Sequence, residues 1–286
     1  MFTCKIENSD GAVYVLTGDE PVYQVIKIEG LNPPKAQINT TTIVGLDGAM
    51  FNSSKLESRN IVLTIRINGD VETNRQNLYQ YFRTKEACTF YYTNQNRDVY
   101  IQGYVESVVC DLFSKSELAQ ISIICPSPYF KSLDEIVSDI SNSLALFTFP
   151  FSINQGNPIP ISSFENSKET NVYNASESQT GVIIEIDIEI PVNTIEIKNI
   201  MTGDDLTLEY SFLANDRVII NTNKGQRSIT LYRNGVQSNI FAAMVKGSTF
   251  FQLSSGDNIF TYLVDDGAND TNVYILFKYY KLYRGV

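Results

Sequence analysis

Residues 59–69, RNIVLTIRING, decide the fold class of this chain. Their apolar and polar side chains alternate with a period of two, which is typical of a half-buried β-strand. The Asn-Gly pair at residues 68 and 69 then favours a turn. One predicted face carries Ile61, Leu63, Ile65 and Ile67, and the other carries Val62, Thr64 and Arg66. We therefore expect a protein built mainly from β-sheet.

The same alternation extends outward from this strand in both directions. In the first half, residues 99–105 and 119–125 are predicted to form further strands. In the second half, strand-like runs recur about every 10 to 12 residues, the spacing of a β-sandwich. These runs are VIIEIDIEI (182–190), TIEIKNI (194–200), LTLEYSF (206–212), DRVIIN (216–221) and SITLYRNG (228–235), followed by residues 250–264 and 273–283. Asn234-Gly235 predicts a hairpin within the series.

One clear helix is predicted after the turn at Gly69. Asp70 can cap its N-terminus, and Glu72 lies in the first turn, where a negative charge is favourable. The predicted apolar stripe is Leu78, Tyr79 and Phe82, and the basic residues suited to the C-terminal end are Arg83 and Lys85.

Composition along the chain predicts two domains. Residues 150–181 are rich in Asn, Ser, Pro and Gly, including the loop-like NQGNPIP at 154–160. Just before them, Ser132 and Glu135 have capping-box spacing ahead of apolar residues, which predicts a short helix. We expect an N-terminal domain of β-structure with one helix (1–131), a linker with the short helix (132–149) and a C-terminal β-sandwich (150–286).

The overall charge and hydropathy exclude some classes of function. The 286 residues include 22 basic and 32 acidic side chains, a net charge of −10 that disfavours specific nucleic-acid binding. No stretch of about 18 apolar residues predicts a membrane span, and MFTCKIENSD does not resemble a signal peptide. We therefore expect the protein to be synthesised in the cytoplasm of the producing cell. We expect it not to associate with a membrane.

Missing residue types argue against catalysis. The chain has no histidine, which removes Ser-His-Asp and Cys-His chemistry and most zinc hydrolases, although carboxylate or lysine chemistry stays open. The four cysteines form no C-x-x-C pair and are expected to be reduced, mostly buried apolar residues. They are Cys4, Cys88, Cys110 and Cys125. We expect no catalytic residues, no metal site and no cofactor.

We interpret three acidic clusters as ordinary turn or surface residues and not as ligand or catalytic sites. Asp204-Asp205 and the acidic residues of 265–270 could ligate calcium, but they lie between strands, where Asp is an ordinary turn residue. Glu185, Asp187 and Glu189 share one strand face and could suggest a glycosidase pair, but three like charges on one face indicate a solvated surface.

A set of short motifs in the first half resembles the phage distal tail protein family. Each motif is short, and their order and spacing together carry the resemblance. The residues are Ile28, Gly30, Leu31, Pro33 and Pro34; Asp47, Gly48, Phe51 and Ser54; Arg59, Asn60, Ile61 and Leu63; and Arg75, Leu78 and Phe82. Residues 100–108 and 119–130 resemble the next strands of the family, and Leu253, Gly256 and Asn258 resemble its closing segment.

The resemblance implies a structural virion protein of a bacteriophage tail tip. In such a protein the N-terminal domain, with an extended hairpin, forms a ring that is typically hexameric, and the C-terminal domain is a galectin-like or carbohydrate-binding-module-like sandwich. One ring face would dock on the tail tube protein, and the other on the tail-associated lysin, baseplate hub or receptor-binding protein. DNA would pass through the ring, which at −10 per copy would carry −60 for six copies.

The hairpin predicted within residues 33–51 is our candidate for an arm between subunits. It carries Pro, Thr and apolar residues without helical or core periodicity, although an ordinary surface loop would have the same composition. The candidate residues are Pro33, Pro34, Thr40, Thr41, Phe51 and Asn52.

Two other functions remain open. A carbohydrate-binding module that helps adsorption to the host cell wall would need exposed aromatic and polar side chains together on one sheet face, and no residues can be assigned to glycan binding. A carboxylate-dependent glycoside hydrolase would need two opposed carboxyl groups in a cleft.

Overall fold

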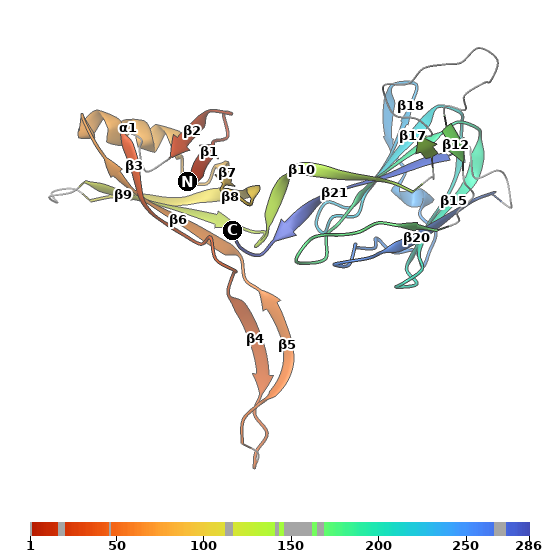
Figure 1. Cartoon of the computed structure of the whole chain (residues 1–286), viewed down its shortest axis with the longest axis horizontal. Coiled ribbons are helices and arrows are strands. Elements are labelled where there is room, and N and C mark those ends of the chain that lie inside the picture. Colours follow the sequence, from red (N-terminus) through yellow and green to blue (C-terminus); the bar gives the residue numbers. More distant parts are fainter. Residues whose placement is uncertain are drawn as a thin grey trace, which may run out of the picture. The chain divides into compact units, whose positions relative to one another are not determined.

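The computed structural model describes residues 2–16, 21–45, 47–111, 117–140, 143–145, 162–164, 169–265 and 273–286. The chain divides into two compact units (Figure 1). Unit 1 comprises residues 1–133 together with 282–286, and unit 2 comprises residues 134–281. The expected class, mainly β with one α-helix among the described residues, is confirmed. The loop-like segment at 154–160 lies outside the described residues.

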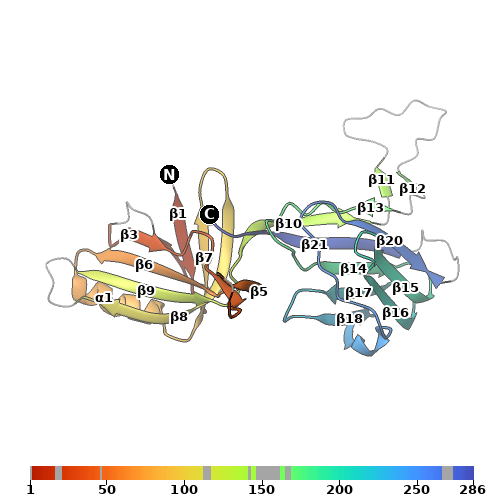
Figure 2. The same cartoon turned by 90° about the horizontal axis from the view of Figure 1, so that it is seen from below.

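Unit 1 is built around an antiparallel sheet with the order β3-β6-β9-β8-β7-β1-β2, and Figure 2 shows β3, β6 and β9 side by side in it. The long β8 pairs with β7 through its first half and with β9 through its second half. The strands are β1 (Thr3–Glu7), β2 (Val13–Leu16), β3 (Tyr23–Glu29), β6 (Arg59–Ile67), β7 (Ala87–Thr93), β8 (Asp98–Cys110) and β9 (Leu118–Cys125).

The core of unit 1 follows the alternation predicted from the sequence. In β6, Ile61, Leu63 and Ile65 are fully buried and Ile67 is nearly so, while Arg66 is exposed. This face packs on the buried residues of β8 and β9, so that the apolar side chains of neighbouring strands form one cluster. Burial of apolar area is the main stabilising contribution of such a cluster.

The helix α1 (Val71–Tyr81) connects β6 to β7. As predicted, Asp70 caps it: its carboxylate accepts hydrogen bonds from the Thr73 backbone N–H at 3.4 Å and from the Thr73 hydroxyl at 2.7 Å. Leu78 and Phe82 are buried as expected, but the third buried side chain is that of Tyr81 and not that of Tyr79, which lies half-buried under Arg75.

A separate two-stranded sheet interrupts unit 1 between β3 and β6. It consists of β4 (Ala36–Thr41) and β5 (Met50–Leu56), which pair only with each other among the described strands. Figure 1 shows this hairpin extending away from the sheet of unit 1. The extended hairpin expected for the N-terminal domain is therefore present.

Unit 2 is a sandwich of two antiparallel sheets around a second apolar core. The first sheet has the order β19-β18-β17-β14-β21-β10 and the second β13-β20-β15-β16. The strands of the first are β10 (Phe130–Asp139), β14 (Ile183–Ile188), β17 (Asp216–Asn221), β18 (Ser228–Arg233), β19 (Val236–Asn239) and β21 (Val273–Tyr283). Those of the second are β13 (Thr170–Asn171), β15 (Val192–Asn199), β16 (Asp205–Phe212) and β20 (Ile259–Val264). A 3-10 turn, η1 (Phe241–Ala243), and the small pair β11 (Ser143–Ala145) and β12 (Ser162–Phe164) complete the described elements.

The short helix expected to begin at Ser132 is wrong, because residues 130–139 form strand β10. Lys131 and Ser132 pair with Tyr100 and Val99 of β8, and the strand then continues into unit 2 beside β21. The capping-box spacing of Ser132 and Glu135 is a local signal, and pairing with strands far away in the sequence overrides it. The boundary between the units consequently falls within a strand, and the last five residues return to unit 1.

The closing motif noted in the sequence has a structural explanation in unit 2. Asn258 is 1% exposed, and its side-chain amide donates to the backbone carbonyls of Ser254 at 2.9 Å and Gly256 at 3.0 Å. Gly256 also exchanges two backbone hydrogen bonds with the buried Asn174. The buried amides therefore join residues 171–180 to residues 253–258, and their polar groups are satisfied.

Candidate functional site

The hairpin of β4 and β5, here called the arm, is the most exposed regular structure in unit 1. Every residue of β4, and every residue of β5 except Leu56, is exposed. Five large apolar side chains lie uncovered on it: Ile38, Ile43, Val44, Met50 and Phe51. A two-stranded hairpin is marginally stable alone, and uncovered apolar side chains gathered in one element are typical of interaction surfaces.

The structure places the six predicted arm residues in the arm or directly before it. Thr40 pairs with Phe51 across the two strands, and the Asn52 side-chain amide donates to the Thr41 hydroxyl at 2.6 Å. Pro33 and Pro34 precede β4 and lie outside the paired strands. The sequence did not single out Ile38, although its apolar side chain is as exposed as that of Phe51, at 62%.

The arm is fixed to unit 1 by a buried arginine at the start of β6. Arg59 is only 3% exposed, and its guanidinium donates to four backbone carbonyls: Gly30, Asn32, Pro128 and Arg284. The guanidinium also lies 4.5 Å from the centre of the Phe130 ring. Burial lowers the pKa of Arg59. Because the four carbonyls take up its donors, the charge is compensated without a carboxylate.

The backbone approaches very closely around this arginine, so we call the region the arm root: Gly30–Pro34, Arg59, Pro128 and residues 284–286. Gly30 has φ +88°, and a Cβ there would lie 2.1 Å from the Asn60 carbonyl oxygen. The Val286 N–H donates to the Leu31 carbonyl at 3.0 Å. The arm therefore emerges from a tightly bonded junction of four chain segments.

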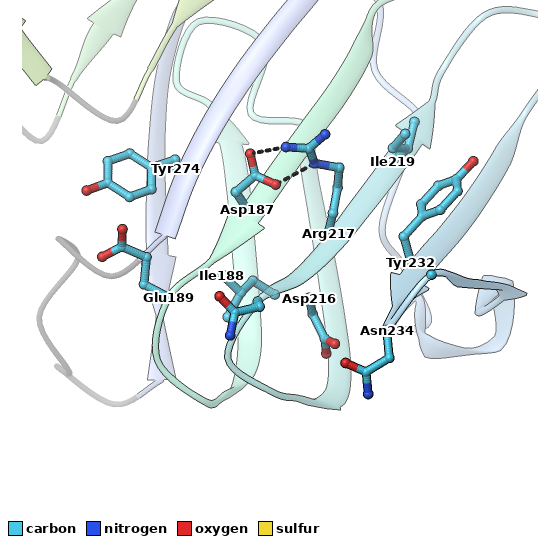
Figure 3. Close-up of a pocket in the computed structure, with 11 residues that line it drawn as sticks. Asp187, Ile188, Glu189, Asp216, Arg217, Ile219, Tyr232, Asn234 and Tyr274 are labelled. Atoms are coloured by element: carbon cyan, nitrogen blue, oxygen red, sulfur yellow. Dashed lines mark hydrogen bonds and ion pairs between the residues drawn. The ribbon is translucent and has the colours of Figure 1, made fainter.

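A groove of about 660 Å³ lies on the outer face of the first sheet of unit 2 (Figure 3). Strand register places Tyr274, Asp187, Arg217 and Tyr232 side by side on β21, β14, β17 and β18. Glu189 and Asn234 also line the groove. No local sequence pattern brings these residues together, because their four strands are spread over the chain from β14 to β21.

The carboxylates of β14 are paired across strands, which the expectation of a merely solvated face missed. Asp187 forms a two-pronged ion pair with Arg217, with Nε–Oδ1 2.6 Å and Nη2–Oδ2 3.0 Å. Glu185 pairs with Lys278 at 2.6 Å. Burial and the Glu189 carboxylate, which accepts a hydrogen bond from the Tyr274 hydroxyl, raise the pKa of Tyr274. The three carboxylates thus help to organise this face.

Beneath one end of the groove, Asp216 and Arg233 tie β17 to β18. Asp216 is 2% exposed; it accepts hydrogen bonds from Arg233 Nε at 2.9 Å and Nη2 at 2.6 Å, and from the Leu213 N–H at 2.7 Å. The bonds from Arg233 hold the pKa of Asp216 below its usual range.

The turn carboxylates have structural partners. Asp265 accepts hydrogen bonds from the backbone N–H groups of Asn193 and Thr194, and Asp204 accepts one from the Thr202 hydroxyl at 2.8 Å. The rest of the 265–270 cluster lies outside the described residues. In the part of the chain that the structure describes, no three potential ligands gather as a metal site, and no helix could cross a membrane.

The four cysteines are free thiols, as expected. Three are buried and Cys110 is half-buried. Burial raises the pKa of Cys88 and of Cys125 to about 12, so neither thiol is activated.

Two family models match the chain, one within each unit. The model described as "Phage tail protein RIFT-related domain" matches residues 5–125, and that described as "Siphovirus-type tail component, C-terminal domain" matches residues 175–279. The chain is a phage tail component of the distal tail protein family. The family expected from the motifs is thereby confirmed, and this tail component is a structural virion protein.

Solved structures of similar fold come from a phage hub protein and from phage baseplates. One is the Dit protein (gp 19.1) of phage SPP1, described as a paradigm of the hub adsorption apparatus in Gram-positive infecting phages; the TM-score is 0.71 at 14% identity, covering 99% of each chain. The phage P2 baseplate in its activated conformation with Ca contains a chain with TM-score 0.59 at 12% identity, covering 100% of each chain. The corresponding baseplate with Sr gives 0.55 at 11%, covering 97% of this chain and 98% of that chain. A search of the curated proteins found no match.

Proposed function

We propose that this tail component assembles into a ring of six copies at the phage tail tip, and that the arm of each copy binds its neighbour. One face of the ring docks on the tail tube protein, and the other holds the tail-associated lysin, baseplate hub or receptor-binding protein. DNA passes through the centre of the ring. The protein is made in the cytoplasm of the bacterial host and functions in the virion, without catalysis.

The exposure of the arm is the observation that carries the proposal. Five large apolar side chains remain uncovered on a hairpin that no other described strand supports. Covering them with a second copy removes apolar area from water, which favours association. A rigid root strengthens this effect, because Arg59 and the surrounding backbone fix the base of the arm before it binds.

Charge also favours contact between arm and neighbour. Each chain carries −10, so copies repel one another on average. Residues 33–57 contain Lys35, Lys55, Asp47 and Glu57 as their charged side chains, which cancel to zero. The arm can therefore approach another copy without the repulsion that the rest of the surface would meet.

The similar solved structures support the placement at the tip. The similar structures are the SPP1 Dit protein, described as a hub protein, and a chain of the P2 baseplate. In each case the fold match spans nearly the whole length of both chains. A ring is the arrangement in which a hairpin reaching from each copy to the next closes without leaving a free end.

The test is the solution mass of the full chain by light scattering across a concentration series, for the natural sequence and for Ile38→Ser. We expect a mass that rises toward six copies for the natural chain and falls back toward one copy for Ile38→Ser. Val236→Ser is the matched control, because Val236 is 66% exposed on a hairpin of unit 2 and Ile38 is 62% exposed on the arm.

A strict monomer at every concentration would overturn self-assembly. Loss of assembly that is equal in the Ile38→Ser and Val236→Ser variants would instead overturn the role of the arm.

A further inference from the structure

The groove of unit 2 combines two aromatic rings with paired polar groups in one row. Tyr274 and Tyr232 stand at its ends, on β21 and β18, and the Asp187–Arg217 pair lies between them (Figure 3). Three intervals between neighbouring strands of about 4.8 Å separate the end strands, so the row spans about 14 Å. The row is therefore long enough for more than one sugar ring.

Several polar groups in the groove are available to a ligand. Among the described residues, the Tyr232 hydroxyl, the Asn234 amide and Nη1 of Arg217 have no hydrogen-bond partner. The Asp187 carboxylate accepts only two bonds and can accept more. Both donors and acceptors thus face solvent beside aromatic rings.

This chemistry matches a saccharide. A pyranose ring has a C–H face that packs on an aromatic ring, and hydroxyls along its edge that bind planar amide, guanidinium and carboxylate groups. The two-pronged ion pair between Asp187 and Arg217 holds both groups in one geometry, so a ligand loses less free energy in ordering them.

Charge narrows the class of ligand. Among the carboxylates that line the groove, Asp187 is paired with Arg217 and Asp216 with Arg233, so Glu189 gives the lining an excess of negative charge. Nucleic acids and other phosphate polymers are repelled by this excess.

We propose that this groove binds a neutral oligosaccharide, with Tyr232 and Tyr274 as stacking platforms and Arg217, Asp187 and Asn234 as hydroxyl partners. The proposal goes beyond ring assembly and does not rest on it, since the groove lies wholly within unit 2. Such a site gives a tail-tip component a direct contact with a sugar surface.

The test is saturation-transfer NMR and calorimetry on the full chain with three neutral probes: chitotriose, cellotriose and maltotriose. We expect at least one probe to bind with saturation of its ring protons. Tyr232→Ala and Tyr274→Ala should each weaken that binding about tenfold or more, and Tyr232→Phe should largely keep it, because the stacking face remains. Arg217→Gln should also weaken binding.

Tyr173→Ala is the matched control: Tyr173 is 61% exposed on unit 2 but does not line the groove, and its contact with the Tyr279 hydroxyl uses its backbone carbonyl. Thermal unfolding and solution mass of every variant separate loss of binding from loss of fold or assembly. No binding of any of the three probes overturns the proposal. Binding that survives in the Tyr232→Ala/Tyr274→Ala double variant overturns it as well.

Discussion

Two hairpins in this protein differ in what supports them. The hairpin of β18 and β19 turns at Asn234 and Gly235, which have φ +52° and +77°, and β18 continues a sheet through β17. Its inner residues, Ile229 and Leu231, are buried in the core of unit 2. The arm has comparable strands but neither a neighbouring strand nor a core beneath it.

The difference indicates which residues stabilise the fold and which residues are available for association with another molecule. The hairpin of β18 and β19 buries its apolar residues in the core of unit 2, and polar groups remain on its outer face. The arm leaves apolar residues uncovered, and its fixed point is the root. We therefore expect substitutions at the root and beneath the β18 hairpin to reduce stability, and substitutions on the arm surface to change association alone.

The largest expected effect comes from Gly30→Ala at the arm root. The new Cβ would lie 2.1 Å from the Asn60 carbonyl oxygen and would also have to accept φ +88°. We expect a loss of about 4 kcal/mol or more in the free energy of unfolding, measured by urea denaturation. Gly45→Ala is the control, since Gly45 has φ +87° and open space around it, and should cost only about 1 kcal/mol. Equal losses would show that the close approach at Gly30 has no consequence.

Arg59→Met tests the hydrogen bonds that hold the root together. The substitution leaves the four backbone carbonyls without their donor, and we expect unfolding to become easier by about 3 kcal/mol. Arg66→Met, on the same strand but exposed, should change stability by less than about 0.5 kcal/mol. If both variants unfold at the same urea concentration, the guanidinium does not anchor the arm.

Asp216→Asn tests the support of the β18 hairpin. Its pKa is lowered by the Arg233 hydrogen bonds, so its contribution is present above the unfolded pKa of about 3.9 and is lost as the pH falls through the lower folded value. We expect Asp216→Asn to cost about 2 kcal/mol at neutral pH and to flatten the acid branch of the stability curve. Asp187→Asn, in an exposed pair, should cost less than about 1 kcal/mol. An unchanged acid branch in Asp216→Asn would contradict this assignment.

The smallest expected effect is that of Ile38→Ser on the dilute monomer. Ile38 contacts mostly water there, so the free energy of unfolding should change by less than about 0.5 kcal/mol. In contrast, Ile229→Ser in β18 should cost about 3 kcal/mol, because Ile229 is fully buried. A large loss in Ile38→Ser at concentrations where the chain is monomeric would mean that the arm supports its own unit.

The sequence predicts most strands of this fold because their signal is local. The alternation from Ile61 to Ile67, the cap at Asp70 and the Asn234-Gly235 turn each depend on neighbouring residues, and the structure has all three. The prediction of a helix beginning at Ser132 is wrong, because the pairing that makes this segment a strand involves Val99 and Tyr100, which no local pattern encodes.

The candidate sites show the same limit. The six residues proposed for an intersubunit arm could be named from composition, because they lie in one continuous segment, and four of them fall within the hairpin. The groove could not, since Tyr274, Asp187, Arg217 and Tyr232 meet only through the register of four strands. Gly30 and Arg59 belong to the motifs that resemble the family. The close approach of Gly30 to the Asn60 backbone and the hydrogen bonds of Arg59 are visible only in three dimensions.

The central claim is that the arm binds a second copy, and amide hydrogen exchange of the arm tests it most directly. At concentrations where the chain is monomeric, the amides of residues 36–56 should exchange rapidly, since the hairpin is exposed and pairs only with itself. At concentrations where the mass rises, we predict protection of these amides by about tenfold or more, with no change at β18 and β19. Arm amides that remain unprotected while the mass rises would contradict the account.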